Sequence, residues 1–337
     1  MNHSPTSTQL PAFQPKRILI TGGAGFIGSH LIHFILHNRP DYEIVNLDLL
    51  TYAGHLDSLK DIVDNEQYTF IQGDICDFPT VESAISNCDC IINLAAETHV
   101  DRSIANSTPF MKTNTLGTQV LLENALNHSI KKFIQVSTDE VYGSLSLNDP
   151  NRFTEQSPLQ PNSPYAASKA AADLLTLAYH RTYHLPAIIT RCTNNFGPYQ
   201  YPEKLIPFFV ARLLKNKKVP LYGDGLNVRD WIHVIDHAEA LLAALEFATP
   251  GEIYNIGAEN EQSNLNLTKQ LIKLCDRDHS QIEFVEDRPG HDRRYAVNPA
   301  KIKNNLSWHA TRSDWPAALE QTVNWYREHQ DWCADKI

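Results

Sequence analysis

Short apolar runs alternate with longer segments along the first 190 or so residues of this chain. The run 16–21 is followed by a glycine-containing turn and then by 26–36, where apolar residues recur at helical spacing. Further strand-like runs lie at 43–47, 68–72, 90–94, 132–136 and 187–190. Because strands that alternate with helices require crossover connections, the pattern predicts an α/β fold with a mostly parallel, doubly wound sheet.

The rhythm changes at about residue 193. Turn-forming residues gather at 194–202 and again at 222–225. We therefore expect a second, smaller lobe in the C-terminal part of the chain.

The boundaries of these two parts follow from the same pattern. Segment 231–257 ends in a strand-like run, 253–256, and we expect it to return to the parallel sheet. The main domain is then expected to cover 16–192, and the smaller lobe 193–230 and 258–330.

Composition and charge exclude several classes of protein. The 337 residues are 42% hydrophobic, which is enough for a large core. The formal net charge is −10 with no run of Lys or Arg, which argues against nucleic-acid binding and against attraction to anionic lipid. No stretch approaches the roughly 20 apolar residues that span a bilayer, so we expect no membrane segment.

The N-terminal segment and the cysteines indicate a cytoplasmic protein. Residues 1–15 are polar and Pro-rich and lack the basic start and apolar run of a signal peptide, so we expect a flexible tail. The cysteines form no C-x-x-C pair and no spacing with histidine typical of zinc ligands, which predicts reduced thiols and no metal site. His99 has no second ligand at a suitable spacing.

The motif T-G-G-A-G-F-I-G carries three glycines directly after the first strand. Gly22 allows a tight turn, Gly25 lets backbone amides approach a pyrophosphate, and Gly28 permits close packing of helix on strand. The position of the motif between a strand and a helix predicts a Rossmann-type dinucleotide site and disfavours a plain glycine turn.

Other strand ends would complete that site. Asp48 lies 20 residues after Gly28, where a carboxylate can accept hydrogen bonds from the adenosine ribose and repel a 2′-phosphate, so the cofactor is expected to be NAD rather than NADP. The alternative is a solvated residue at the end of a strand. Asp74 and Ile75 are expected near the adenine, and the small side chains of 94–96 (Leu94, Ala95 and Ala96) beneath the cofactor, although the latter also suit ordinary strand-end packing.

Tyr165 and Lys169 are spaced i, i+4 at the start of an Ala-rich helical segment, so both side chains lie on one face. A nearby ammonium stabilises a phenolate and lowers its pKa, so the pair predicts a base that can take a hydroxyl proton. On its own this spacing also fits a solvated helix face.

Thr138, Asp139 and Glu140 end another predicted strand. Thr138 can hydrogen-bond a reacting oxygen over the cofactor crevice. Adjacent residues of a strand point to opposite faces, so both carboxylates share a site only if the chain leaves the strand there. The alternative is a solvated acidic loop.

Six motifs together resemble the dTDP-glucose 4,6-dehydratase family of the extended short-chain dehydrogenases. They are T-G-G-A-G-F-I-G, L-D-x-L-T-Y-A-G at 47–54, L-A-A-E-T-H-V-D-R-S at 94–103, V-S-T-D-E-V-Y-G at 136–143, Y-x-x-S-K, and R-P-G-H-D-R-R-Y-A at 288–296. The likeness covers essentially the whole chain after the tail. It is most specific in Thr138–Glu140 and 288–296, because related epimerases usually lack the acidic pair.

The resemblance implies a role for each of five residues. Tyr165 takes the proton of the sugar 4-hydroxyl while NAD takes hydride from C4, with Thr138 and Lys169 assisting. Glu140 is then the base at C5 and Asp139 the acid at the departing C6 hydroxyl. The hydride finally returns to C6, and a proton returns to C5. The cycle has no net redox change, so NAD can stay bound.

Further contacts follow from charge and from the resemblance. A nucleotide diphosphate brings about two negative charges, and Lys204, Arg229 and Arg288 are the candidate partners, although any one of them also suits a surface ion pair. The resemblance adds further cofactor contacts, namely Phe26, Ile27, Leu49, Leu50, Thr51, Thr98, Thr113 and Asn194. It adds as substrate contacts Thr98, Asn195, Glu203, Leu205, Asn264, His291 and Tyr295.

Two other functions remain compatible with these residues. One is a nucleotide-sugar 4-epimerase or decarboxylase with the same Tyr–Lys base, against which only Asp139 and Glu140 speak. The other is a non-catalytic NAD-binding regulatory protein, since a fold alone does not fix a function. The resemblance also implies a homodimer, while the nucleotide base, thymine or uracil, stays open.

Overall fold

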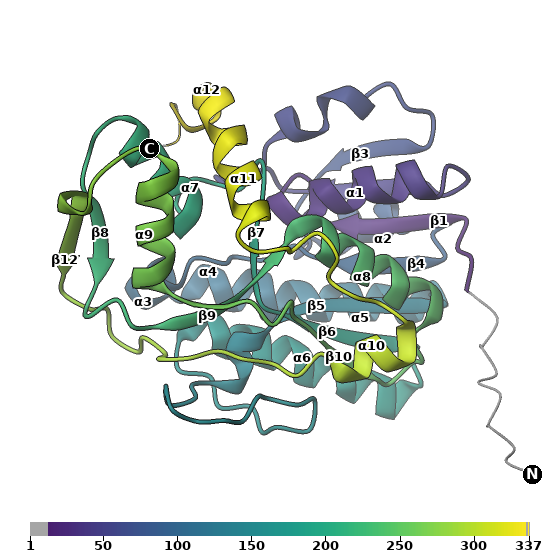
Figure 1. The fold of residues 1–337 in the computed structure, drawn as a ribbon. Helices are drawn as coiled ribbons and strands as arrows, with labels where there is room; N and C mark the ends of the chain where they lie inside the picture. Colours follow the sequence, from purple (N-terminus) through teal and green to yellow (C-terminus); the bar gives the residue numbers. More distant parts are fainter. Residues whose placement is uncertain (1–12, 335, 337) are drawn as a thin grey trace, which may run out of the picture.

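The computed structural model describes residues 13–334 and residue 336, and its centre is a seven-stranded sheet (Figure 1). The strand order is β10-β6-β5-β4-β1-β2-β3, and every neighbouring pair is parallel. The strands are β1 (Arg17–Thr21), β2 (Glu43–Asp48), β3 (Tyr68–Gln72), β4 (Cys90–Asn93), β5 (Lys132–Thr138), β6 (Ala187–Cys192) and β10 (Ile253–Ile256). The predicted fold class is confirmed, and each predicted strand-like run contributes one of these strands.

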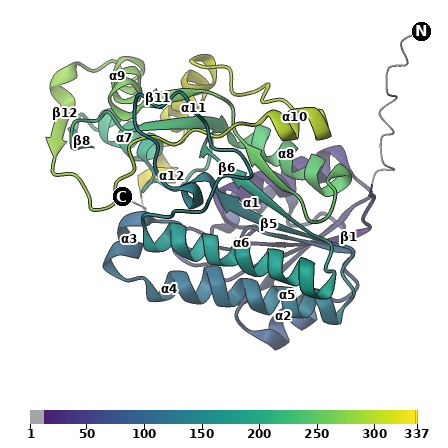
Figure 2. The same cartoon turned by 90° about the horizontal axis from the view of Figure 1, so that it is seen from below.

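Helices cover both faces of the sheet, as Figure 2 shows from below. One layer contains α1 (Phe26–Asn38), α8 (Val234–Phe247) and α10 (Ala300–Leu306). The other contains α2 (Phe78–Ala84), α3 (Val100–Ala105), α4 (Thr108–Phe110), a π-helical stretch (Met111–Gly117), α5 (Thr118–Asn127) and α6 (Pro164–Tyr183). Short 3-10 helices follow β2 (Leu56–Ile62) and β5 (Asp139–Tyr142).

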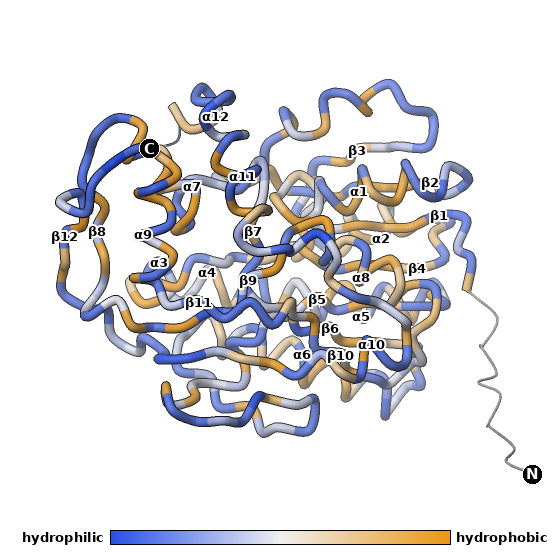
Figure 3. Tube along the Cα trace, viewed as in Figure 1, coloured by the Kyte–Doolittle hydropathy of each residue, from blue (hydrophilic) through white to orange (hydrophobic). Residues whose placement is uncertain are grey.

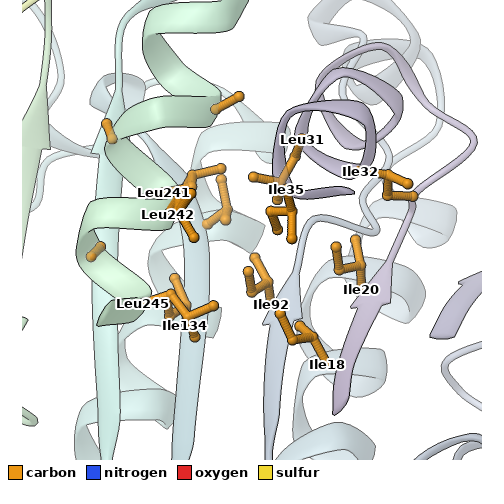
Figure 4. Close-up of a cluster of buried hydrophobic side chains, with 14 of the residues drawn as sticks. Ile18, Ile20, Leu31, Ile32, Ile35, Ile92, Ile134, Leu241, Leu242 and Leu245 are labelled. Atoms are coloured by element: carbon orange, nitrogen blue, oxygen red, sulfur yellow. The ribbon is translucent and has the colours of Figure 1, made fainter. Parts of the chain in front are cut away.

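The apolar runs of the sequence become strands buried on both faces. In β1, Ile18 and Ile20 face the α1 and α8 layer, whereas Leu19 faces the α2 and α5 layer. Figure 4 shows the first of these cores, which joins Ile18, Ile20, Ile92 and Ile134 of the sheet to Leu31, Ile32, Ile35, Leu241, Leu242 and Leu245 of the two helices. Each such side chain stabilises the fold by about 1.5–3 kcal/mol relative to an exposed position. In Figure 3 the strand β1 is largely orange, whereas many of the surrounding loops are blue.

The smaller lobe has two short sheets and its own core. One sheet has the order β11-β9-β7 and the other pairs β12 with β8. The elements are β7 (Asn194–Phe196), α7 (Leu205–Leu214), β8 (Val219–Tyr222), β9 (Val228–His233), β11 (Glu261–Ser263), α9 (Asn264–Leu274), a 3-10 turn (His279–Gln281), β12 (Ile282–Val285), α11 (Ala317–Glu328) and α12 (Gln330–Ala334). Phe209, Leu271 and Leu319 are central in its core.

The chain passes between the sheet domain and the smaller lobe at other residues than the sequence predicts. The strand 253–256 does return to the parallel sheet beside β6, but residues 231–233 pair within the lobe as part of β9. Conversely, Trp308 and the helix α10 before it pack in the core of the parallel sheet, although they fall in the predicted lobe segment 258–330. The apolar faces of α8 and β10 explain this, because α10 covers them.

The predicted flexible tail lies mostly outside the described residues. Residues 1–12 belong to the part that is not described, but Phe13 is half-buried. Its amide donates to the Glu246 carbonyl oxygen at 2.8 Å, and its ring lies 5.0 Å from the Lys132 Nζ. The prediction of a free tail is therefore wrong at Phe13. Among the helices of residues 13–334, none is long and apolar enough to cross a bilayer.

Candidate active site

A cavity of about 630 Å³ lies where the carboxyl ends of the parallel strands meet the smaller lobe. Strands β1, β2, β4, β5 and β6 contribute their last residues or the turns that follow them, which is where ligands bind in open α/β sheets. The lobe closes the cavity with residues of β9, α9 and the segment 288–295. The site is thus built by both halves of the molecule.

The glycine motif forms a cradle that larger residues would fill. A Cβ on Gly22, which has φ of 71°, would lie 2.6 Å from the Ala95 nitrogen, and a Cβ on Gly28 would lie 2.3 Å from the Gly22 carbonyl oxygen. Helix α1 begins directly after Gly25, and no side chain caps its first amides. Free amides at a helix N-terminus bind phosphate, so the cradle fits the pyrophosphate of a dinucleotide.

Asp48 ends β2 beside this cradle and is 8% exposed. Its Oδ2 accepts the Ala24 amide at 2.9 Å and its Oδ1 accepts the Leu50 amide at 2.8 Å. Burial raises its pKa, whereas these two amide hydrogen bonds oppose the rise. Each oxygen keeps a further lone pair, so the carboxylate can still accept hydrogen bonds from a ribose.

One predicted cofactor residue does not line the cavity. Leu50 has a positive φ of 57°, and its side chain packs against the core beneath α1. The turn is fixed by the hydrogen bond from its amide to Asp48, which directs the side chain away. All other predicted cofactor residues line the cavity, namely Gly22, Gly25, Phe26, Ile27, Gly28, Asp48, Leu49, Thr51, Asp74, Ile75, Leu94, Ala95, Ala96, Thr98, Thr113, Tyr165, Lys169 and Asn194.

Asp74 follows β3 at one end of the cavity. The Lys112 ammonium lies 3.0 Å from its Oδ2, and the Cys76 amide donates to its Oδ1 at 2.9 Å. Burial opposes ionisation, but these two donors together lower the pKa of Asp74. Lys112 also lines the cavity, and no sequence motif indicated it.

Tyr165 and Lys169 project from the first turns of α6 into the cavity. The helix begins at Pro164, and the Ser163 hydroxyl oxygen caps it by accepting the Ala166 amide at 3.1 Å. Both side chains are buried, and the Lys169 Nζ donates to the Val136 carbonyl oxygen at 2.6 Å. The predicted shared face is therefore confirmed.

The pKa of Tyr165 differs from the expectation. Burial raises it well above the usual value, and the negative charge of Glu140 adds to this. Burial also lowers the pKa of Lys169. Desolvation and a neighbouring carboxylate therefore raise the pKa of the phenol, whereas the Tyr–Lys spacing predicts a lower pKa.

Strand β5 ends directly before Asp139 and Glu140, which is the condition for both carboxylates to share a site. After Thr138 it turns into a 3-10 helix, and the Thr138 Oγ1 accepts the Glu140 amide at 3.3 Å. Asp139 and Glu140 both line the cavity as a result, together with Thr138. The alternative of a solvated acidic loop is excluded, because Asp139 is only 2% exposed.

Asp139 and Glu140 differ in the charges that surround them, and so in how strongly the pKa of each is raised. Burial and the neighbouring Glu140 raise the pKa of Asp139 well above its usual value. Burial also raises the pKa of Glu140, but the positive charges of Arg229, Arg288 and Lys204 oppose that rise. Two neighbouring carboxyls with different environments suit an acid and a base.

The three predicted phosphate partners surround the lobe side of the cavity. The Arg229 guanidinium lies 4.1 Å from the centre of the Tyr295 ring and donates to the Asp292 carbonyl oxygen at 3.0 Å. The Lys204 Nζ donates to the Thr98 carbonyl oxygen at 3.1 Å. All of these residues except Asp292 line the cavity.

Arg288 presents a donor that no residue in the described part of the chain accepts. Its Nη1 is buried without a hydrogen-bond partner, and its Nε lies 3.6 Å from the Asp101 Oδ1. The Asn264 Oδ1 is likewise buried without a partner. Unpaired buried polar groups are costly, so both atoms indicate a ligand that completes their hydrogen bonding.

The remaining predicted substrate residues line the cavity, but several of their polar atoms are bound within the protein. The Asn195 Oδ1 accepts from the His237 Nδ1 at 2.9 Å, and its Nδ2 donates to the Thr193 carbonyl oxygen at 3.0 Å. His291 Nδ1 lies 2.6 Å from the Asp287 Oδ1. Glu203, Leu205 and Tyr295 also line the cavity.

Sequence reasoning missed a further set of cavity residues. Glu97, His99 and Asp101 lie within the motif 94–103, and their closeness in sequence to Thr98 could have indicated that they line the cavity. The other residues come together only through the fold. They include Lys112, Cys192, Gln200, Tyr201, Tyr222 and Trp231. Among the described residues, no three His, Cys, Asp or Glu side chains are grouped as metal ligands would be.

Comparisons with known proteins agree with this geometry. The family model described as GDP-mannose 4,6 dehydratase matches residues 19–314. A dTDP-glucose 4,6-dehydratase of Actinoplanes sp. is 48% identical over 297 residues, which cover 87% of this chain and 92% of the relative. The crystal structure of a dTDP-glucose 4,6-dehydratase from Streptomyces venezuelae with NAD bound superimposes with a TM-score of 0.92 at 46% identity, over 95% of this chain and all of the other. A UDP-glucose 4-epimerase from Thermotoga maritima is more distant, with a TM-score of 0.83 and 30% identity over 93% of this chain and 99% of the other.

Proposed function

This chain belongs to the GDP-mannose 4,6 dehydratase family and, within it, to the dTDP-glucose 4,6-dehydratases, and we propose that its cavity carries out that dehydration with the residues described above. It is an NAD-dependent hydro-lyase that converts the nucleotide-linked glucose into its 4-keto-6-deoxy derivative. The observation that carries the proposal is that the buried Asp139 and the half-buried Glu140 line one cavity together with Tyr165. The 4-epimerases are more distant relatives.

The first step needs a base at the sugar 4-hydroxyl, and Tyr165 is placed to be that base. When bound, NAD supplies the hydride acceptor and a positive charge that favours the phenolate. Lys169 is a second positive charge on the same helix face, and a positive charge beside the phenol favours the phenolate. Thr138 holds the reacting oxygen through its hydroxyl.

The second step removes water across C5 and C6. Once C4 is a ketone, the C5 proton is acidic, and Glu140 takes it. Asp139 is the better acid because burial keeps it protonated, so it gives its proton to the departing C6 hydroxyl. A 4-epimerase has no step that needs these two groups.

The smaller lobe is the proposed substrate-binding part. Arg288, Arg229 and Lys204 hold the diphosphate, and the unpaired Nη1 of Arg288 supports this because a phosphate oxygen would satisfy it. A guanidinium fork suits a phosphate better than a surface carboxylate, and Asp101 is a distant partner at 3.6 Å.

We further propose a homodimer and a cytoplasmic location. Leu174 on α6 is 58% exposed and Leu116 at the adjoining π-helical stretch is 48% exposed, which is an apolar face that a second copy of this chain would cover. All six cysteines are free, as suits a reducing compartment.

One assay tests the reaction directly. Purified protein is incubated separately with dTDP-glucose and with UDP-glucose, and the 4-keto product is measured by the absorbance that it develops in alkali. We expect product from dTDP-glucose. Absence of product from both substrates, or a product with an inverted C4 and an intact C6 hydroxyl, would contradict the proposal.

A further inference from the structure

Two segments from different halves of the molecule form neighbouring parts of the cavity wall. Residues 49–55 follow β2, and Leu49, Thr51, Ala53 and Gly54 of this segment line the cavity. Residues 199–203 follow β7 at the start of the lobe, and Gln200, Tyr201 and Glu203 line it as well. The two segments are far apart in sequence but contact each other through side chains.

The first contact is a hydrogen bond to a carboxylate. The Tyr52 hydroxyl donates to the Glu203 Oε1 at 3.0 Å. The Arg102 guanidinium lies 3.7 Å from the centre of the Tyr52 ring, and its Nη2 lies 3.4 Å from the Glu203 Oε2. Burial and the charge of Glu203 raise the pKa of Tyr52, so the phenol stays protonated and continues to donate. Hydrogen bonds to charged groups are the stronger kind.

The second contact is an aromatic cluster that includes the C-terminal helix. The Tyr201 ring meets the Tyr52 ring edge-on with centroids 5.4 Å apart, and it stacks on His55 at 5.6 Å. Trp332 of α12 meets His55 edge-on at 5.5 Å and donates from its Nε1 to the Gln200 carbonyl oxygen at 3.3 Å. Figure 1 shows α12 between the lobe and the segment that follows β2.

Segment 49–55 also contacts the glycine motif and Asp48, which fit the dinucleotide. The His55 amide donates to the Ala24 carbonyl oxygen within the glycine motif at 2.9 Å. Gly54 lies so close to Asp48 that a Cβ on it would be 3.0 Å from the Asp48 Oδ1. Movement of residues 49–55 away from the lobe would therefore open the wall at the ribose acceptor.

We propose that Tyr52, His55, Tyr201, Glu203 and Trp332 form an interlobe latch that retains NAD in the cavity between turnovers. The inference rests on the proposed function, because a reaction that returns the hydride to its product gains nothing from release of the cofactor. Tyr52, His55 and Trp332 are positioning residues, since they act through the segments that line the cavity. The latch should control how fast NAD leaves, and not how the sugar reacts.

The test is the dissociation rate of NAD from the holoenzyme without any sugar nucleotide. The protein is loaded with radiolabelled NAD and chased with an excess of unlabelled NAD. Tyr52→Phe keeps the ring but removes the hydroxyl, and we expect NAD to leave roughly ten-fold faster, which corresponds to about 1.4 kcal/mol. Tyr183→Phe is the matched control, because Tyr183 is 57% exposed at the last residue of α6, and it should release NAD at the wild-type rate.

A second variant removes the other end of the latch. Trp332→Leu should also release NAD roughly ten-fold faster. In the double variant, the increase in the NAD dissociation rate should be smaller than the product of the two single increases, because both contacts act on Tyr201 and its segment. Wild-type dissociation rates in both single variants would overturn the latch. So would a variant whose apo form melts at a lower temperature while its NAD dissociation rate is unchanged, since that is a structural effect alone. Failure of the dehydration assay with wild-type protein would instead contradict the proposed function and leave these rates unaffected.

Discussion

The carboxyl group of Asp139 is held in a place that is costly for a charged side chain. It is 2% exposed, and among residues 13–334 its Oδ2 has no hydrogen-bond partner and its Oδ1 has only the Thr138 hydroxyl at 3.3 Å. Desolvation disfavours the ionised form, so the group is kept as an acid where the proposed elimination needs one. Two predictions follow from this residue and its neighbour Glu140, one for catalysis and one for stability.

The double variant Asp139→Asn, Glu140→Gln should separate oxidation from elimination. Both amides keep the shape of the carboxyls but cannot transfer protons, whereas Tyr165 and Lys169 remain. Mixed with stoichiometric dTDP-glucose, the variant should accumulate bound NADH, seen as nicotinamide absorbance, while loss of water falls by a factor of about 10²–10⁴ or more. Normal turnover to any product with both carboxyls gone would show that they take no part in the reaction.

The single variant Asp139→Asn should also change how stability depends on pH. The pKa of Asp139 is raised on folding, so the folded state binds more protons than the unfolded state as the pH rises above the usual aspartate range, and the stability contribution is lost with rising pH. The amide does not titrate, so the variant should lose less stability than the wild type between pH 5 and pH 8. Thermal unfolding of the apo proteins at both pH values measures this, and an equal loss in the two proteins would contradict it.

Helix α6, which carries the proposed catalytic residues Tyr165 and Lys169, is joined to the sheet by a buried ion pair. One turn after Lys169, the helix carries Asp173, which is fully buried and accepts a hydrogen bond from the Arg191 Nε of β6 at 2.9 Å. The Tyr142 ring lies 4.8 Å from the same guanidinium. The ion pair therefore joins α6 to β6, which pairs with β5, the strand that ends in Thr138.

Removal of one charge from this pair should destabilise the protein strongly. Asp173→Asn leaves Arg191 buried without a counter-charge, and we expect the free energy of unfolding to fall by about 3–5 kcal/mol. The exposed pair of Arg17 and Glu43 provides a matched control, since Glu43→Gln should cost less than about 1 kcal/mol. Urea unfolding measures both changes. Similar small losses in the two variants would show that α6 does not depend on the buried pair.

The elements that were predictable from sequence are those with a strong local signal. The strands of the parallel sheet are continuous apolar runs because helices cover both faces, so β1 and β4 are evident from the sequence. Strands β8 and β12 have four residues each, and they pair only with each other across some sixty residues of chain, which no local pattern reveals. The same holds for Trp308, whose place in the sheet core depends on α8 and β10 being there first.

The candidate site likewise contains features that local sequence motifs predict and others that only packing brings together. The glycine cradle, the Thr138–Glu140 turn and the Tyr165 face are local in sequence, so the motifs predict them. Lys112, Tyr201 and the unpaired Nη1 of Arg288 reach the cavity through packing between the two halves, and only the structure shows them. The pKa of Tyr165 belongs to this second group, because burial and Glu140 decide its direction.

At the scale of the whole molecule, the active site depends on how two halves are held together. The sheet domain, with its strand ends and helix α6, supplies the glycine motif and the proposed catalytic side chains, while the lobe supplies the cationic side chains Arg229 and Arg288. The chain crosses between the halves several times, since β10 and α10 return to the sheet after segments of the lobe. Separation of the halves is therefore limited by covalent connections as well as by contacts such as the proposed latch.

The proposed contact between two copies of the chain is the exposed face of α6, which lies beside α5 in the helix layer seen in Figure 2. Leu174 occurs twice in a two-fold symmetric interface, and burial of each leucine contributes about 1.5–3 kcal/mol. Leu174→Arg should therefore weaken a dimer by roughly two to four powers of ten in its dissociation constant, giving monomers at micromolar concentration in analytical ultracentrifugation. Leu226→Arg, at a leucine that is 42% exposed in the lobe, is the matched control and should remain dimeric. A wild-type monomer would show that the chain forms no such dimer, and a dimer that survives Leu174→Arg would show that the contact lies elsewhere. If Leu174→Arg alone gives monomers, the exposed face of α6 joins the subunits, while the inner face of the same helix carries Tyr165 and Lys169.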